Sequence, residues 1–497
     1  MQGQKQFTDK VVVRFRLSER VPRHNLYRRL DEVLDLRFLY EETQALYSHT
    51  GQPSLDPVVF FKLLLVGRLE NIASDRRLLA HCAMRLDILL FLGYELDEEL
   101  PWHSTVSRTR QLYPAALFEH LFDRVFHLCV AQGLVAGDTQ AIDSAPVKAN
   151  ASLSSLCEKQ AAPPALTVAG RPAPAAPFPA AALLSAPAHQ LRREAARKAK
   201  HGPEPGALGG NRPNARLVSN KTHYSPSDPE ARISIKPGKA RALNYLCSLA
   251  VDPAKGVISH IQADLADSRD SLHLPGLIKR LQARRTANEV PLREAVADTN
   301  YANGFHYAFL AQRGVTAWIP TSKRYKPAIE GFAYLPGVNA YQCRAGKLLP
   351  FRTYGRTPDG GWQKNYRADD KDGKHGPFKA SCTPGAPQRK ITRTAFDAPY
   401  ARAWRRQHSR QGQHMRRVRQ STVEPALGQL LPHDGLRRIG TKGQAAAHKT
   451  MRLAAAAYNL KKLLKHRPKQ PRSRALVILP DHLLAATGLF WRTQRGA

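Results

Sequence analysis

The order of the elements predicted between Thr139 and Ile319 constrains the fold of this chain more than any other feature. The turn sequence Asp252-Pro253-Ala254-Lys255-Gly256 lies between two apolar segments and predicts a β-hairpin. In chain order, the sequence predicts a strand at 139–147, hairpin strands at 244–251 and 257–261, a helix at 271–285, the end of a strand at 295–298, a helix at 301–312 and a strand at 315–319.

This order of strand, hairpin, helix, strand, helix and strand is that of an RNase H-like α/β domain. We therefore expect an α/β protein with an RNase H-like mixed sheet flanked by helices. An irregular stretch at about 321–403 follows, and then a basic segment from Arg402 to Arg419. Two further helical stretches close the folded part, and the longer one runs from Gly443 to His466.

The first quarter of the chain predicts an all-α domain. Apolar residues recur at helical spacing from about Leu26 to Gln132, and Ser54-Leu55-Asp56-Pro57 is a good helix start. Further helices are expected to open at Ser74 and at His103. The helix at 103–110 carries hydroxyl side chains together with Arg108 and Arg110, a combination that can contact a DNA backbone or enter its major groove. A solvated helix face would have the same composition.

A low-complexity basic insertion divides the predicted α/β domain. Residues 158–213 are rich first in Ala and Pro and then in Arg and Lys, a composition that cannot bury a dense core. The predicted organisation is a helical DNA-binding domain at 1–135, the first part of the α/β domain at 136–157, the insertion at 158–213, the core of the α/β domain at 214–320, a second insertion at 321–403, C-terminal helices carrying Glu424 at 404–470 and a tail at 471–497.

Charge identifies the kind of partner. The chain has 76 Lys and Arg residues against 40 Asp and Glu, a formal net charge of +36 that is spread along most of its length, so a polyanion is expected. A ribosomal or RNA-coating protein would show the same balance. No apolar run of membrane length and no signal peptide is recognised, and the six cysteines form no CxxC pair. We expect a soluble, cytoplasmic protein without a membrane partner and with reduced thiols.

Three carboxylates are placed where they could carry chemistry. Cleavage of a phosphodiester needs an activated oxygen nucleophile and charge neutralisation, which two Mg²⁺ ions held by carboxylates provide. Asp143 lies in the first predicted strand, Asp298 ends a later one, and Glu424 is an isolated acid behind the basic segment. Each also has an ordinary interpretation, as a turn, cap or ion-pair residue. Pro425 disfavours helix at Glu424, so a helix is expected to start near Pro425 or to be distorted there.

Several segments together resemble bacterial insertion-sequence transposases with an RNase H-like DDE domain, over nearly the whole chain. The matching segments are Ile142-Asp143-Ser144 with Lys148-Ala149-Asn150-Ala151, Ala297-Asp298-Thr299-Asn300-Tyr301, Val423-Glu424-Pro425 with Leu427-Gly428-Gln429, Ala457-Tyr458-Asn459-Leu460-Lys461-Lys462-Leu463, Ser225 to Arg232, and Ser54 to Arg77. No single segment is decisive, but all of them in this order are specific.

The resemblance implies that Asp143, Asp298 and Glu424 are the catalytic triad and the metal ligands. It implies two Mg²⁺ ions as cofactors, with Mn²⁺ able to substitute. The expected partner is double-stranded DNA, both the terminal inverted repeats of the element and the target, bound by a homo-oligomer. Beside the site, the basic segment is expected to hold the DNA backbone through Arg416, Arg417 and Arg419.

The chain departs from the pattern of this family in two places. A Lys or Arg commonly follows the glutamate by two helical turns, but Leu431 stands there. Related proteins often carry four cysteines before the glutamate, whereas this chain keeps Cys343 and Cys382 and has Gly373 and Gly376 in place of the middle pair. Two thiols do not close a structural zinc site.

The expected function is DNA transposition, that is, metal-dependent strand cleavage and strand transfer at the ends of an insertion sequence. The first alternative is a transposase-derived protein that binds DNA but has lost catalysis. An RNA-associated basic protein is a more distant alternative, since it would not need acids at strand ends.

Overall fold

The computed structural model describes residues 14–47, 54–159, 219–234, 241–322, 325–357, 361–371, 378–382, 385–386 and 388–466. The chain divides into a compact unit, Met1–Leu464, and a second unit, Lys465–Ala497. Most of the predicted insertion at 158–213 and the tail at 471–497 lie outside the described residues. Every element from α1 through the body of α16 belongs to the first unit.

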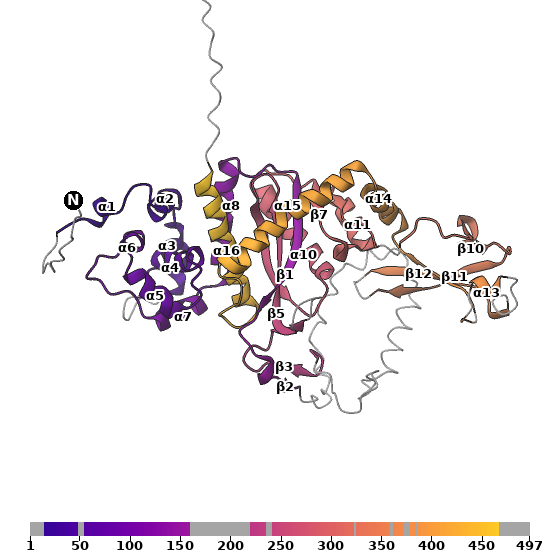
Figure 1. Ribbon diagram of the computed structural model, residues 1–497, viewed down its shortest axis with the longest axis horizontal. Helices are drawn as coiled ribbons and strands as arrows, with labels where there is room; N and C mark the ends of the chain where they lie inside the picture. Colours follow the sequence, from indigo (N-terminus) through magenta and orange to yellow (C-terminus); the bar gives the residue numbers. More distant parts are fainter. Residues whose placement is uncertain are drawn as a thin grey trace, which may run out of the picture. The chain divides into compact units, whose positions relative to one another are not determined.

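The N-terminal region is helical, as predicted. Its helices are α1 (Leu17–Arg20), α2 (Leu26–Val33), α3 (Phe38–Thr43), α4 (Pro57–Leu69), α5 (Asp75–Ala83), α6 (Leu86–Leu92), α7 (His103–Leu112) and α8 (Ala115–Ala131), with a 3₁₀ turn η1 (Gln44–Leu46) (Figure 1). The start of α4 follows its sequence signal. Asp56 accepts hydrogen bonds from the amides of Val58 and Val59, and Pro57 occupies the first turn, where its missing N–H costs nothing.

A six-stranded mixed sheet forms the centre of the chain. Its strands are β1 (Thr139–Lys148), β4 (Arg232–Ser234), β5 (Ala242–Asp252), β6 (Val257–Leu265), β7 (Glu294–Val296) and β8 (Thr316–Trp318). The order is β4-β5-β1-β7-β8, with β6 also paired to β5. Because β1 pairs antiparallel with β5 and parallel with β7, the central strand joins a hairpin to a parallel half. This is the RNase H-like arrangement that the sequence predicted, and the α/β fold class is confirmed.

The hairpin turn follows its sequence. Asp252 accepts a hydrogen bond from the amide of Ala254 through its carboxylate and from the amide of Gly256 through its carbonyl. Gly256 adopts φ +70°, a left-handed conformation that glycine takes without steric cost. The connecting helices are α10 (Asp270–Ala287) and α11 (Gly304–Gln312), the second preceded by the 3₁₀ turn η4 (Thr299–Tyr301).

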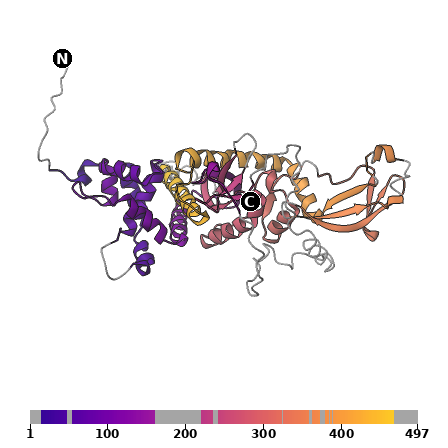
Figure 2. The same cartoon turned by 90° about the horizontal axis from the view of Figure 1, so that it is seen from below.

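The stretch at 321–403 is not irregular, and that expectation was wrong. It contains a five-stranded antiparallel sheet, in the order β13-β12-β11-β10-β9 (Figure 2). The strands are β9 (Phe332–Leu335), β10 (Ala340–Cys343), β11 (Leu348–Arg356), β12 (Trp362–Arg367) and β13 (Lys390–Thr394), with a 3₁₀ turn η5 (Pro336–Val338) and the short helix α13 (Lys379–Cys382). A small core of five buried residues stabilises this sheet: Tyr341, Leu349, Tyr366, Ala368 and Ile391. Elsewhere, β2 (Cys157–Glu158) pairs with β3 (His223–Tyr224) behind a 3₁₀ turn η2 (Leu153–Ser155).

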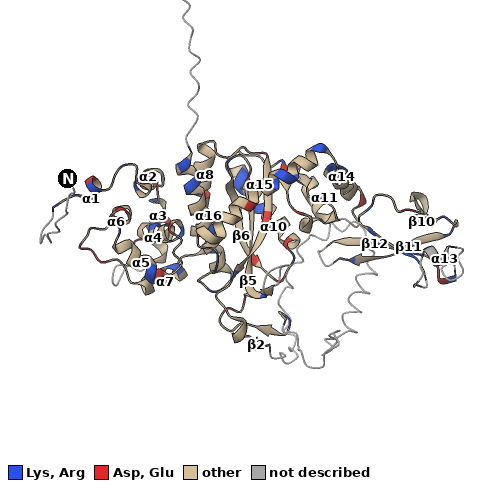
Figure 3. Ribbon diagram, in the orientation of Figure 1, with Lys and Arg blue, Asp and Glu red and all other residues tan. Residues whose placement is uncertain are grey.

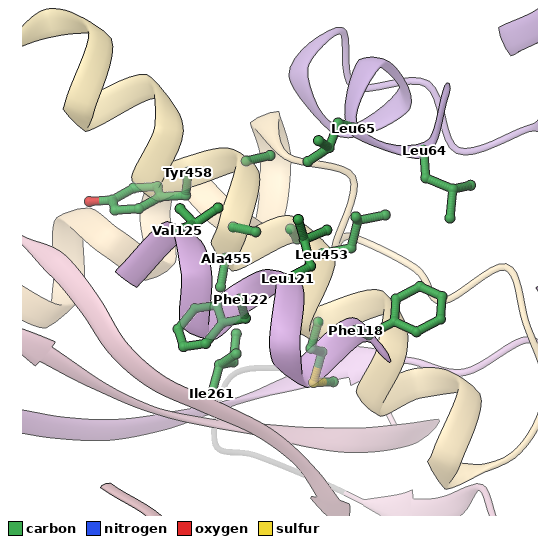
Figure 4. Close-up of a cluster of buried hydrophobic side chains, with 14 of the residues drawn as sticks. Leu64, Leu65, Phe118, Leu121, Phe122, Val125, Ile261, Leu453, Ala455 and Tyr458 are labelled. Atoms are coloured by element: carbon green, nitrogen blue, oxygen red, sulfur yellow. The ribbon is translucent and has the colours of Figure 1, made fainter. Parts of the chain in front are cut away.

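Three helices close the unit: α14 (Asp397–Gln407), α15 (Arg410–His433) and α16 (Gln444–Lys465). Helix α16 packs against α8 and the sheet. Figure 4 shows Phe122 of α8 between Ala455 of α16 and Ile261 of β6, within the largest buried cluster. The alanines of α16 leave room for this close approach, and the same cluster includes residues of the N-terminal helices, such as Phe61.

Asn459 of α16 performs a structural task. Its side-chain amide accepts a hydrogen bond from the amide of Ile258 and donates one to the carbonyl of the same residue, both at 2.9 Å. Asn459 is fully buried. It therefore satisfies a backbone N–H and C=O of β6 at the position where the pairing of β6 with β5 shifts in register.

We expect Asn459→Ala to destabilise the protein by about 2–3 kcal/mol, because it leaves two buried backbone groups without partners. Chemical denaturation followed by circular dichroism would measure this change. Ser421→Ala, an exposed serine on α15, is the control and should change the free energy of unfolding by less than about 0.5 kcal/mol. Equal stability of the two variants would contradict the assignment.

Candidate active site

Asp143 lies on β1, and Asp298 follows the end of the neighbouring strand β7. The last pair in the parallel register of β1 and β7 is Ala141 with Val296, and each acid stands two residues beyond its member of this pair. The Oδ1 atom of Asp143 accepts a hydrogen bond from the amide of Ser144 at 2.8 Å. Since both strands run in the same direction, the end of β7 brings its acid to the middle of β1.

Asp298 is fixed by the turn that follows it. Its Oδ1 atom accepts a hydrogen bond from the amide of Asn300 at 3.0 Å, and its Oδ2 atom accepts one from the Asn300 side chain at 2.9 Å. Asp298 is therefore the N-cap of η4 as well as a candidate ligand. The ordinary interpretation as a cap and the functional one are both compatible with this geometry.

A buried tyrosine lies close to both acids. The Tyr301 hydroxyl donates to Oγ of Ser144, the residue after Asp143, at 3.0 Å. Burial is the main reason why the pKa of Tyr301 lies well above its ordinary value, and the charges of Asp270, Asp143 and Asp298 raise it further. The phenol thus remains a neutral hydrogen-bond donor, and it interacts electrostatically with the carboxylates of Asp143, Asp270 and Asp298.

Helix α15 brings the third predicted acid and an arginine to the same place. It runs from Arg410 to His433 with Pro425 inside it, so of the two alternatives for Pro425 the start of a helix was wrong. Nη1 of Arg419 lies 2.8 Å from Oδ2 of Asp143, and its Nη2 lies 3.6 Å from Oε1 of Glu424. The Arg419 side chain is only 13 % exposed, whereas that of Glu424 is 60 % exposed. Arg419 is therefore a cation bridge between two of the predicted catalytic acids.

The three carboxylates do not form a closed ligand cluster. Within the described residues, no group of three or more His, Cys, Asp or Glu side chains is arranged to hold a metal ion. The donor chemistry nevertheless suits Mg²⁺, which prefers carboxylate oxygens. Arg419 supports this fit, because its guanidinium already places a positive charge between Asp143 and Glu424.

A cavity of about 900 Å³ opens beside Asp298. Aromatic and basic side chains line it, among them Trp318, Tyr325, Trp404, Arg416, Arg417 and Arg419. Basic residues recur along α15 and the neighbouring α14 (Figure 3). Arg416 and Arg417 are exposed, while Arg419 forms an ion pair with Asp143. The cavity thus offers positive charge next to a candidate catalytic acid.

The two arginines predicted on α7 have different surroundings. Arg108 is exposed. Arg110 donates two hydrogen bonds to Asp75 at 2.7 and 2.9 Å, and its side chain is 17 % exposed. Arg110 thus joins α7 to α5, and Arg108 is the more accessible of the pair.

The two departures from the family pattern also have structural counterparts. Leu431 is half-buried and packs against the main core, so α15 uses this position for packing. All six cysteines are free thiols, and Cys343 and Cys382 are half-buried. Gly373 and Gly376 lie outside the described residues.

One acid near the site was not predicted. Asp270 is the first residue of α10 and acts on the Tyr301 phenol. An acid in the first turn of a helix is the usual partner of the helix dipole, so its sequence position carries no functional signal.

An RNase H-like sheet with acids on its central strands, beside a basic helix, defines a class of enzymes that process nucleic acids. Two family models match the chain: the Transposase domain (DUF772) over residues 15–112 and the Transposase DDE domain over residues 342–464. No curated protein and no solved structure matches it. Together these two matches support an insertion-sequence DDE transposase. The second match contains Arg419 and Glu424, whereas Asp143 and Asp298 lie between the two matched regions.

Among the described helices, none combines the length and the apolar character needed to cross a membrane.

Proposed function

We propose that this transposase binds the terminal inverted repeats of its element and catalyses metal-dependent strand cleavage and strand transfer through Asp143, Asp298 and Glu424. The observation that carries the proposal is the bridge that Arg419 makes between Asp143 and Glu424, with Asp298 just beyond the end of β7, the parallel neighbour of β1. Asp143 and Glu424 are 281 positions apart in the sequence, yet both contact the guanidinium of Arg419.

The carboxylates of Asp143, Asp298 and Glu424 would hold two divalent ions, Mg²⁺ or Mn²⁺. Such a metal pair supplies an activated oxygen nucleophile and neutralises the leaving oxygen. The side chains of the chain then have separate tasks. Hydrogen bonds from Asn300 orient Asp298. The hydrogen bond from Tyr301 to Ser144 fixes the residue that follows Asp143 on β1.

DNA is proposed to approach along α15. Arg416 and Arg417 are exposed beside the cavity that contains Asp298, so they can bind backbone phosphates without reading sequence. Recognition of the element ends is assigned to the N-terminal helices, with exposed Arg108 on α7 as a phosphate contact. We expect a homo-oligomer, since both element ends must be held together.

The proposal is tested by a nicking assay with full-length protein and a labelled duplex that carries the inverted repeat of the element. We expect cleavage at the element end in Mg²⁺ or Mn²⁺, none in EDTA, and none on a random duplex of equal length. Preferential binding of the element end without cleavage would indicate the catalytically inactive alternative. Equal affinity for RNA and for random DNA, without cleavage, would contradict the proposal as a whole.

A further inference from the structure

A second basic cavity lies at the end of β1, away from the candidate active site. It has a volume of about 560 Å³, and among the described residues it shares no lining residue with the cavity beside Asp298. Its cationic residues are Lys148, Arg241, Arg437 and Arg438, and none of the described residues that line it is acidic. Lys148 belongs to the segment Lys148-Ala149-Asn150-Ala151, for which the catalytic site gives no role.

Backbone pairing holds two of these cations side by side. The amide of Ile439 donates to the carbonyl of Lys148 at 2.8 Å, and Lys148 forms a parallel bridge with Arg438. Asn150 adds a second tie, because its side chain donates to the carbonyl of Gly440 at 2.9 Å and accepts from Arg438 at 3.2 Å. The cavity wall is therefore built before any ligand arrives.

The charge of this cavity is not neutralised within the described residues. None of Lys148, Arg437 and Arg438 has an Asp or Glu partner within 4.0 Å there, although these residues come from two distant parts of the chain. Arg241 likewise lacks a carboxylate partner in this part of the chain, and its Nε atom is buried without a hydrogen-bond acceptor. Buried N–H groups normally have acceptors, so the cavity calls for an oxygen-rich anion. A phosphate group meets both requirements, since it carries charge and several acceptor oxygens.

The distance between this cavity and the candidate active site indicates which backbone phosphate of the DNA the cavity would bind. Lys148 lies five residues beyond Asp143 on β1, which corresponds to about 16 Å at about 3.3 Å per residue. A duplex rises about 3.4 Å per base pair, so about five base pairs span the same length. Resting on the function proposed above, we propose that this cavity binds a backbone phosphate of the duplex being cut, about five base pairs from the cleavage position.

The test removes, in separate variants, the arginine charges of the protein and the phosphate charge of the DNA that are proposed to interact. The protein variant is Arg437→Gln with Arg438→Gln in the full-length chain; both residues are exposed, so their replacement leaves the core intact. The DNA variant is the element-end duplex with one methylphosphonate about five base pairs from the cut. Affinity is measured by fluorescence anisotropy over a range of salt concentrations. Cleavage of the unmodified duplex in Mg²⁺ is followed in parallel.

We expect the double variant to bind the unmodified duplex about ten-fold more weakly, with a smaller dependence of affinity on salt. The methylphosphonate should weaken binding of the wild-type protein by a similar factor and have little effect on the double variant. Lys279→Gln with Arg313→Gln is the matched control. It removes two exposed cations that have no carboxylate partner within the described residues, and it should remain sensitive to the methylphosphonate.

A methylphosphonate penalty of equal size in the wild-type protein and the double variant would overturn the inference. So would a variant that binds the cut duplex normally and loses affinity only for a second, target duplex. If the wild-type protein cuts the duplex but shows no such coupling, only this inference fails. If it neither cuts nor prefers the element end, the proposed function fails.

Discussion

Asp298→Asn should abolish cleavage and strand transfer while binding of the element ends is retained. The replacement removes one negative charge and keeps the size of the side chain. Its amide oxygen can still accept the hydrogen bond from the amide of Asn300, so η4 retains its cap. We therefore expect loss of metal binding and chemistry without loss of the fold.

The expected loss is about 10³-fold or more in the rate of cleavage, which corresponds to about 4 kcal/mol of transition-state stabilisation. Single-turnover cleavage of a labelled element-end duplex in Mg²⁺ measures the rate, and anisotropy measures binding. Asp138→Asn is the matched control, because Asp138 is an exposed acid beside the other end of β1 and pairs with Arg293. Arg417→Ala should show the opposite pattern, weaker binding with cleavage retained at saturating protein. An Asp298→Asn protein that cuts at the wild-type rate would refute the assignment.

The central sheet could be predicted because its signals are local. β5 is largely apolar, and the Asp252–Gly256 turn marks the hairpin by itself. Asp143 and Asp298 each stand two residues beyond the last pair in the register of two parallel strands. The second sheet gave no such signal. Its strands contribute only a few isolated buried residues, such as Leu349 and Ile391, among Lys and Arg, and no clear alternation results.

The link between Arg419 and Asp143 could not be predicted from local patterns. The two residues are 276 positions apart, and their contact depends on how α15 crosses the sheet. Pro425 misled the prediction of this helix, because a proline removes one backbone donor. It lies on the exposed side of α15, where water can satisfy the carbonyl that loses its partner. The same helix packs the half-buried Leu431 against the main core, where a basic side chain would lose this apolar contact.

The bridge made by Arg419 predicts a second large effect, on metal affinity. Arg419 lies on oxygens of Asp143 and Glu424 that a divalent ion would need. An ion must therefore displace a charge-assisted hydrogen bond with Asp143 in a largely buried setting, which is worth about 1.5–3 kcal/mol. The contact with Glu424 adds little, because that side chain is mostly exposed and screened by solvent.

Arg419→Gln should accordingly bind Mn²⁺ about ten-fold more tightly than the wild-type protein without DNA, since 1.4 kcal/mol corresponds to a factor of ten. Isothermal titration calorimetry or the electron paramagnetic resonance signal of free Mn²⁺ would measure this, independently of cleavage. Arg416→Gln is the control, because it removes the same charge from the same helix but makes no ion pair with either acid within the described residues. Its Mn²⁺ affinity should stay within about two-fold of the wild-type value.

Binding of DNA should also raise the Mn²⁺ affinity of the wild-type protein. Arg419 also lines the cavity beside Asp298, so a phosphate entering that cavity competes with Asp143 for the guanidinium. Binding of an element-end duplex should then tighten Mn²⁺ binding to the wild-type protein, and the Arg419→Gln protein should show little of this coupling. If the Arg419→Gln variant instead binds Mn²⁺ more weakly than the wild-type protein, Arg419 holds the carboxylates in position for the ion, and the competition argued here does not occur.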